Sequence, residues 1–232
     1  MHIPDAVRTL ERDLRDVFGG RLLSLVAYRG GSGDDRSAPT LAVVDALTAD
    51  DLRACADRVA EWHDAGLATP LLLAAHEFGR SLDAFPFEFG AILAEHAVVA
   101  GADPFAELKV DLAHLRQACE IQARSHLLHL REGFLETRGR GDMLAALIVR
   151  SAAPLAALVR SVARLRGSDA IDADVAFRMV ETAAGAPAGS LTNIGSLAGS
   201  ASLTPDAARR LFPPYLDAVE RLTHYIDRWS DV

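Results

Sequence analysis

The sequence has few of the residues that build disulfide frameworks, zinc sites or membrane spans. Only two cysteines, Cys55 and Cys119, occur among its 232 residues. Two distant thiols make neither a disulfide framework nor a zinc site, which is typical of a reducing compartment. No apolar run approaches the roughly 18 residues of a membrane span, and charged residues stand near the N-terminus where a signal peptide needs an apolar core. We therefore expect a cytoplasmic protein without a membrane partner.

Positive charge is also scarce in this chain. Lysine and arginine total 24 against 32 acidic residues, which makes the formal net charge −8, and Lys109 is the single lysine. A protein that coats nucleic acid needs a basic face for the phosphates, so this balance argues against a nucleic-acid partner. Half of the residues are apolar, and the length fits one large domain or two small ones. Composition alone assigns no function.

The first hundred residues alternate between helix and strand patterns. Apolar residues recur at the helical period over residues 5–18, and Gly19 and Gly20 then end the helix. Thr48, with Asp51 three residues later, resembles a capping box and predicts one helix that extends to Trp62. Apolar or alternating runs predict strands over residues 22–28, 40–45, 69–75, 85–89 and 98–99, with a short helix or turn over 76–82. We assign residues 1–106 to a small α/β domain.

Strand patterns stop at residue 107, and the rest of the chain has helical periodicity. A proline inside a helix removes a backbone donor, so we expect a kink at Pro154 and a break at Pro213 and Pro214. The pattern predicts helices over residues 107–136, 141–166, 172–184 and from 204 onward, with residues 185–203 unassigned. Residues 107–232 are thus predicted to form a helical bundle, and the predicted fold class is α+β.

The most informative segment is the polar loop between the first two predicted strands. It contains Gly30, Gly31, Ser32 and Gly33. Glycines after a strand let backbone N–H groups approach phosphate oxygens, so this loop has the composition of a phosphate cradle. It is not a Walker loop, because no Gly-Lys-Ser/Thr follows, and it is not a GxGxxG turn. By spacing alone, an ordinary hairpin connection is the simpler interpretation.

The order of these segments resembles a known family. A helix, a strand, a Gly-Gly-Ser loop and a second strand are followed by Phe-Pro-Phe-Glu-Phe over 85–89 and a helical C-terminal part. This arrangement is similar to bacterial nucleotidyltransferase-domain proteins whose helical C-terminal domain is like that of aminoglycoside nucleotidyltransferases. The resemblance implies a Gly-Ser turn that binds a triphosphate, an Asp-x-Asp pair on the next strand that binds two Mg²⁺, and a third carboxylate from a later strand.

The sequence departs from this family pattern at the metal-binding positions. Where the pattern has Ser-Asp-x-Asp, this chain has Ala38 and Thr40 in place of the two acids. The third carboxylate falls on Glu88, which is the one catalytic residue that the resemblance implies, and no metal site is expected. The ligand-binding residues that it implies are Gly30, Gly31, Ser32 and Thr40.

One glutamate cannot replace three carboxylates. Two-metal phosphoryl transfer holds two divalent ions about 4 Å apart with several anionic oxygens. We therefore expect a degenerate nucleotidyltransferase-like protein, a binding or regulatory module for a nucleotide or another small molecule. In the alternative, Asp34 and Asp35 complete an active nucleotidyltransferase of a small molecule or protein, and only then are Mg²⁺ and a nucleoside triphosphate its cofactors. The sequence leaves a homodimer open.

Arginines of the helical part offer two further alternatives. Arg124 and His129 match the Arg-x4-His spacing of HEPN-type ribonucleases or toxin–antitoxin components. Residues five apart on an α-helix are about 140° apart around its axis, so an exposed helix face is the simpler interpretation. Arg150, Arg160 and Arg164 are candidates to line an anion-binding cleft, although ordinary exposed helix charge also accounts for them.

Overall fold

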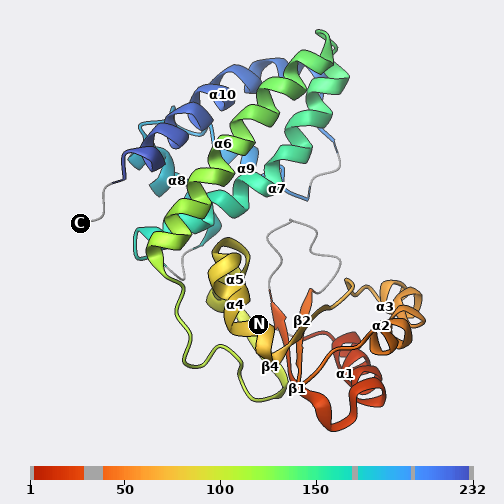
Figure 1. Cartoon of the computed structure of the whole chain (residues 1–232). Helices are drawn as coiled ribbons and strands as arrows, with labels where there is room; N and C mark the ends of the chain where they lie inside the picture. Colours follow the sequence, from red (N-terminus) through yellow and green to blue (C-terminus); the bar gives the residue numbers. More distant parts are fainter. Residues whose placement is uncertain (1–2, 29–38, 169–171, 200–201, 230–232) are drawn as a thin grey trace. The chain divides into compact units, whose positions relative to one another are not determined.

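A computed structural model describes residues 3–28, 39–168, 172–199 and 202–229 (Figure 1). These residues form two compact units: unit 1 has the described residues up to Asp111, and unit 2 has those from Leu112 onward. Unit 1 contains a four-stranded sheet with helices, and the elements described in unit 2 are all helices. The fold class is therefore α+β, as the sequence predicted. The division into domains at residues 106 and 107 stays a prediction.

The sheet of unit 1 is mixed and has the strand order β3-β2-β1-β4. β1 pairs antiparallel with both β2 and β4, whereas β2 and β3 are parallel. The bounds are Leu22–Tyr28 for β1, Thr40–Val44 for β2, Leu71–Ala74 for β3 and His96–Gly101 for β4. Each of these strands overlaps a segment that the sequence predicted as strand.

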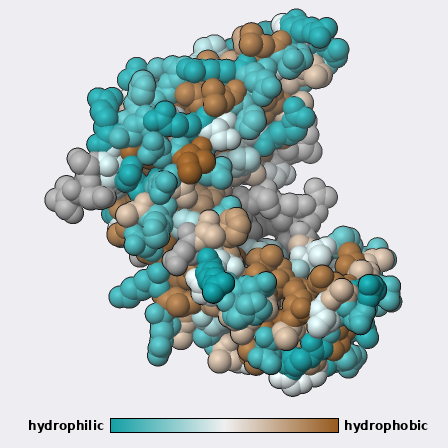
Figure 2. Space-filling model, in the orientation of Figure 1, coloured by the Kyte–Doolittle hydropathy of each residue, from teal (hydrophilic) through white to brown (hydrophobic). Residues whose placement is uncertain are grey.

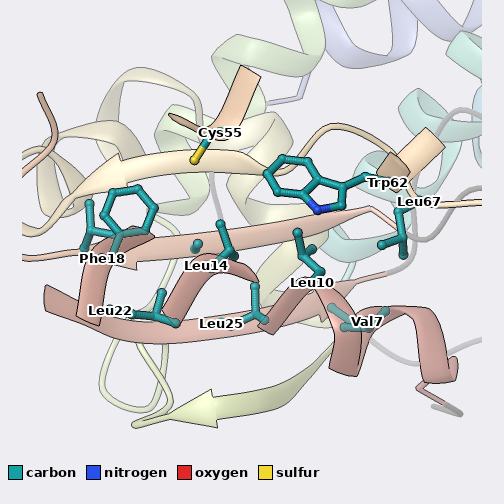
Figure 3. Packing of buried hydrophobic residues seen from close by; sticks show 12 residues of the cluster. Val7, Leu10, Leu14, Phe18, Leu22, Leu25, Cys55, Trp62 and Leu67 are labelled. Carbon is teal, nitrogen blue, oxygen red and sulfur yellow. The ribbon is translucent and has the colours of Figure 1, made fainter. Parts of the chain in front are cut away.

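Helices cover both faces of this sheet. Because side chains alternate along a strand, Leu25 and Ala42 pack into a cluster with α1 and Trp62, whereas Val26 and Leu41 pack with Phe78 of α4 on the other face. Figure 3 shows the first cluster, with leucines of α1 stacked against β1 and Trp62. The helix bounds are Asp5–Phe18 for α1, Ala49–Ala56 for α2, Val59–Asp64 for α3, Ala75–Ala84 for α4 and Pro86–Ala94 for α5.

Two predictions in unit 1 are wrong in detail. The segment 85–89 is not a strand, because Pro86 starts α5 and carries Glu88 into its first turn. A proline suits the first position of a helix, and Phe89 and Ile92, three residues apart, face the core together. The helix predicted from Thr48 to Trp62 is divided into α2 and α3, although its predicted capping box is present.

Unit 2 is built around α7, which spans Gly141–Leu165 and is buried along much of its length. By length and composition α7 could cross a membrane, but it packs against four other helices and has the burial of a core helix. These are α6 (Leu112–Thr137), α8 (Ala173–Ala184), α9 (Thr192–Gly195) and α10 (Pro205–Asp227). Figure 2 shows that hydrophilic residues cover much of the visible surface of unit 2. Pro154 lies inside α7, and the predicted kink stays a prediction.

The expected break at Pro213 and Pro214 does not occur, since both prolines lie inside α10. A proline in a helix interior costs about 3 kcal/mol. Phe212 and Tyr215, on either side of the pair, are buried on one stripe that continues along α10. Burial of this stripe offsets the lost hydrogen bonds and keeps the helix continuous.

The unassigned segment 185–203 is organised by a buried carboxylate. Glu181 is 5% exposed, and its carboxylate accepts hydrogen bonds from the backbone N–H groups of Leu191 and Thr192 at 2.7 and 2.8 Å. A third bond, from Gly189, is 3.2 Å long. Backbone donors at a helix start favour an anion, and this carboxylate fixes α9 against α8.

Candidate functional site

The candidate ligand-binding residues meet the described structure at the start of β2. Thr40 begins this strand opposite Ala27 of β1, and the N–H of Tyr28 donates to the carbonyl of Pro39 at 3.1 Å. The β1–β2 pair thus ends at the loop that connects the two strands. Gly30, Gly31 and Ser32 lie outside the described residues.

Thr40 has an unusual environment for a hydroxyl group. The residue is 1% exposed, and its Oγ1 has no hydrogen-bond partner among the described residues. A buried hydroxyl without a partner costs about 1–3 kcal/mol in protein mutational data, so such groups are uncommon and often belong to functional sites. Ser24 Oγ and Thr192 Oγ1 are also buried without a described partner, so the role of Thr40 in ligand binding stays a prediction.

The sheet around Thr40 provides no carboxylate. None of the four described strands contains an aspartate or a glutamate. Thr40 itself lies opposite Ala27 of β1, and β3, the strand on the other side of β2, consists of three leucines and an alanine. The strands on both sides of β2 therefore offer no oxygen ligand from a side chain beside Thr40.

Glu88 does not replace the missing strand acids. It is exposed in the first turn of α5, and no hydrogen bond or ion pair joins it to Thr40 in the described part of the chain. Among the described residues, no group of three His, Cys, Asp or Glu side chains could hold a metal ion. Because Mg²⁺ prefers several oxygen ligands in octahedral geometry, these residues do not fit a two-magnesium centre. Asp34 and Asp35 lie outside the described residues.

Comparison with known proteins supports the fold on which this site is built. No protein-family model and no curated protein sequence matches the chain. Among solved structures, it is similar to the spectinomycin adenyltransferase AAD(9) from Enterococcus faecialis, crystallised with ATP and spectinomycin, with a TM-score of 0.61. The match covers 97% of this chain and 99% of that protein at 10% sequence identity. The chain has a nucleotidyltransferase-like fold.

The Arg124–His129 pair of the ribonuclease alternative does not form a joint site. Arg124 forms ion pairs with Glu120 of its own helix and with Asp227 of α10, at 3.3 and 2.9 Å. His129 is exposed, and its described polar contact is with Glu132. Each side chain is thus engaged separately on the surface of unit 2, which does not favour the nuclease alternative.

Unit 2 contains a polar chain that the sequence does not reveal, built on the buried Tyr215 and the half-buried His126 and Ser151. His126 Nε2 lies 2.7 Å from the Tyr215 hydroxyl, which donates to Ser151 Oγ at 3.0 Å, and Ser151 donates to the carbonyl of Ile148 at 2.8 Å. Each hydroxyl has one proton, so this direction requires His126 to donate from Nε2 to Tyr215. The lone pair of His126 is then on Nδ1. Burial, with a smaller effect from nearby His129, lowers the pKa of His126 to about 4.

This polar chain borders a small cavity between α6 and α7. The cavity has a volume of about 320 Å³, and its lining includes His126, Ser151 and Arg150. Arg150 is the one arginine of the predicted anion-binding trio that lines a cavity described here. His126 and Tyr215 are 89 positions apart, so no local spacing could have identified their pairing.

Proposed function

We propose that this protein is a nucleotidyltransferase-like binding module that lacks metal-dependent transfer activity and takes a nucleotide or another small molecule as its ligand. The observation that supports it is the absence of any carboxylate from the four described strands. A cytoplasmic location belongs to the same proposal. The similar adenyltransferase was crystallised with ATP and spectinomycin, which supports a ligand of this size and class.

The physical reason is electrostatic. Two divalent ions beside a triphosphate need fixed negative ligands that offset their mutual repulsion. Where such ligands would stand, this sheet has a threonine hydroxyl and aliphatic side chains. A neutral hydroxyl can accept or donate a hydrogen bond, but it contributes no charge to a metal site.

Ligand binding without metal would use neutral donors and acceptors. Thr40 Oγ1 is a buried group without a partner in the described structure, so a hydrogen bond from a ligand would recover the free energy lost on its burial. Gly30, Gly31 and Ser32 would add backbone N–H groups for a phosphate. We expect this binding to be independent of Mg²⁺.

The test measures catalysis and binding separately. Pyrophosphate release is followed with ATP, CTP, GTP or UTP, with Mg²⁺ or Mn²⁺ and with candidate acceptors that include spectinomycin. We expect no release from the wild type or from Glu88→Gln. Calorimetric titration of the same nucleotides should give equal affinities in Mg²⁺ and in EDTA, and Thr40→Val should weaken binding.

A different result would identify the active-enzyme alternative. Turnover in the wild type that Glu88→Gln abolishes would show that other carboxylates, such as Asp34 and Asp35, complete a catalytic centre with Glu88. Binding that requires Mg²⁺ would also contradict the proposal. Failure of every nucleotide and acceptor to bind would reject the ligand class.

A further inference from the structure

Unit 2 contains a second and larger cavity, which we call the arginine cavity. Its volume is about 830 Å³, within the range of about 300–1,000 Å³ for small-molecule sites. The start of α6 and the ends of α7, α8 and α10 line it, so every lining residue belongs to unit 2. The polar and aromatic residues that define it are Arg116, Arg166, Arg221, Tyr225, Arg228 and Trp229.

Among the described residues, the charge of this lining is of one sign. Four arginines face the cavity, and no acidic residue is among its described lining residues, although the whole chain has a net charge of −8. Arg116 and Arg221 are partly neutralised by Glu120 and Asp217, at 3.3 and 2.9 Å. Arg166 and Arg228 have no carboxylate partner in the described part of the chain. Both residues are exposed, so their two guanidinium charges are accessible to an anion from solvent.

Neighbouring groups already orient these two free guanidinium groups. Arg166 Nη1 donates to the Tyr225 hydroxyl, and Arg228 Nε donates to the carbonyl of His224 at 3.3 Å. A guanidinium has five N–H donors, so each keeps several for a ligand. Because these hydrogen bonds already restrict the two side chains, the arginines lose less conformational entropy when a ligand binds.

Helix capping explains only part of this cluster. Arginine commonly lies at a helix C-terminus because the carbonyl groups there make a partial negative charge of about half a unit. Arg221 and Arg228 have this role, since they donate to the carbonyls of Gly185 at the end of α8 and of His224 in the last turn of α10, at 3.2 and 3.3 Å. Arg116 lies near the start of α6 instead, and Arg166 donates to a tyrosine hydroxyl.

An aromatic pair forms the other part of the lining. Tyr225 and Trp229 are one helical turn apart and meet edge to face, with ring centroids 5.3 Å apart. Both are half-buried, so they present apolar surface to the cavity. Their rings would contact the uncharged part of a ligand whose anionic part binds the arginines.

We propose that the arginine cavity binds a small molecule that has two or more adjacent phosphate groups. Guanidinium groups bind phosphate oxygens through paired N–H donors, and several arginines around one cavity match several linked phosphates better than a single carboxylate. The Tyr225–Trp229 pair favours a nucleotide over inorganic oligophosphate. This site involves none of the residues of the proposed function, so either proposal can fail without the other.

Tryptophan fluorescence provides a local reporter for the test. The chain has two tryptophans: Trp229 lines the cavity, and Trp62 is 2% exposed in unit 1. The full chain with Trp62→Phe is titrated with ATP, inorganic triphosphate and adenosine in EDTA. We expect both oligophosphates to change the Trp229 signal, ATP at the lower concentration, and added salt to weaken both.

Substitutions then assign this signal to the arginines. We expect the double variant Arg166→Ala/Arg228→Ala to weaken binding of both oligophosphates at least tenfold. The pair Arg166→Lys/Arg228→Lys should lie between it and the wild type, because lysine keeps the charge and loses the paired donors. Arg210→Ala is the matched control, since Arg210 is exposed on α10 and does not line the cavity. Thr40→Val should leave the Trp229 signal unchanged.

Several results would overturn the proposal. These are no binding of either oligophosphate at millimolar concentration, a change with adenosine alone, or equal affinity in the double alanine variant and Arg210→Ala. A signal lost in Thr40→Val and kept in the arginine variants would assign the binding to unit 1 instead. If the alanine pair does not fold, the lysine pair decides the test.

Discussion

Two buried hydroxyl groups, one in each unit, have opposite environments. Thr40 in the sheet and Tyr215 in the bundle are 1% and 0% exposed. The Tyr215 hydroxyl is hydrogen-bonded on both sides, to His126 and Ser151, whereas Thr40 Oγ1 has no partner among the described residues. The His126–Tyr215–Ser151 chain in unit 2 is therefore hydrogen-bonded at both hydroxyls, whereas Thr40 Oγ1 has no described partner, a property that it shares with Ser24 Oγ in the sheet and Thr192 Oγ1 in unit 2.

The two units also differ in the charged side chains that they bring together. The described strands of unit 1 contain no acidic residue, so the nucleotidyltransferase-like sheet presents no fixed metal ligands. The helices of unit 2, which in sequence look like ordinary exposed bundle helices, bring four arginines to one cavity. A nucleotidyltransferase-like fold therefore does not by itself imply nucleotidyl transfer. The function of each unit has to be inferred from its own side chains.

The largest expected effect is a loss of stability at low pH, caused by protonation of His126. The folded pKa of His126 is about 4, against 6.5 for the free side chain, so below pH 6.5 the unfolded state binds a proton that the folded state excludes. The stability that neutral His126 provides is present above pH 6.5 and is lost as the pH falls toward 4. The shift corresponds to at most about 3 kcal/mol.

Chemical denaturation of the wild type and of His126→Gln at pH 7 and pH 4 measures this loss. Because the variant lacks the titrating group, the stability advantage of the wild type should shrink by up to about 3 kcal/mol between these values. NMR titration of the imidazole gives the pKa directly. A value for His126 near 6.5 would contradict the burial argument.

A smaller loss is expected when the central hydroxyl of the network is removed. Tyr215→Phe keeps the buried ring and leaves His126 Nε2 and Ser151 Oγ without the partner they share. An unsatisfied buried group costs about 1–3 kcal/mol. Because His126 and Ser151 are both half-buried and Ser151 still donates to the carbonyl of Ile148, the free energy of unfolding should fall by about 1 kcal/mol, the lower end of this range. Tyr225→Phe, which removes the hydroxyl of a half-buried tyrosine on the same helix, serves as the control and should change stability less.

Much of the fold could be predicted because its signals are local. The strands β1 and β2 and the helix α1 follow from apolar periodicity within single segments. The segment 85–89 was misassigned because three alternating phenylalanines over five residues fit a strand as well as a helix start, and Pro86 decides for the helix. The continuity of α10 across two prolines depends on tertiary burial, which no local pattern reveals.

Some features of the candidate sites are also visible in the sequence, and others appear only in the folded structure. That positions 38 and 40 are not acidic is visible in the sequence. The absence of acids from β3 gains its meaning only in the structure, which places that strand beside β2. The pairing of His126 with Tyr215 joins two helices 89 positions apart. The arginine cavity collects side chains from separate helix ends, so sequence analysis selected three other arginines of the bundle.

The smallest expected effect is that of Thr40→Val on the free energy of unfolding. It tests the comparison of the two hydroxyls most directly, because removal of the Tyr215 hydroxyl should destabilise the protein and removal of the Thr40 hydroxyl should not. Thr40→Val removes a buried hydroxyl and keeps the branched shape of the side chain. No described group loses a partner, and a buried polar group is replaced by an apolar one. The free energy of unfolding should therefore stay the same or rise by up to about 1 kcal/mol, whereas affinity for the ligand should fall. Thermal and chemical unfolding of the ligand-free protein measure the first quantity. Calorimetric titration with ATP measures the second, with Arg166→Ala/Arg228→Ala present in both proteins so that binding at the arginine cavity does not contribute. Ser24→Ala is a useful companion, because Ser24 Oγ is also buried without a partner on the adjacent strand and is not among the candidate ligand-binding residues. Destabilisation by Thr40→Val would mean that Oγ1 is hydrogen-bonded within the protein itself, and the distinction between the two hydroxyls would then be wrong.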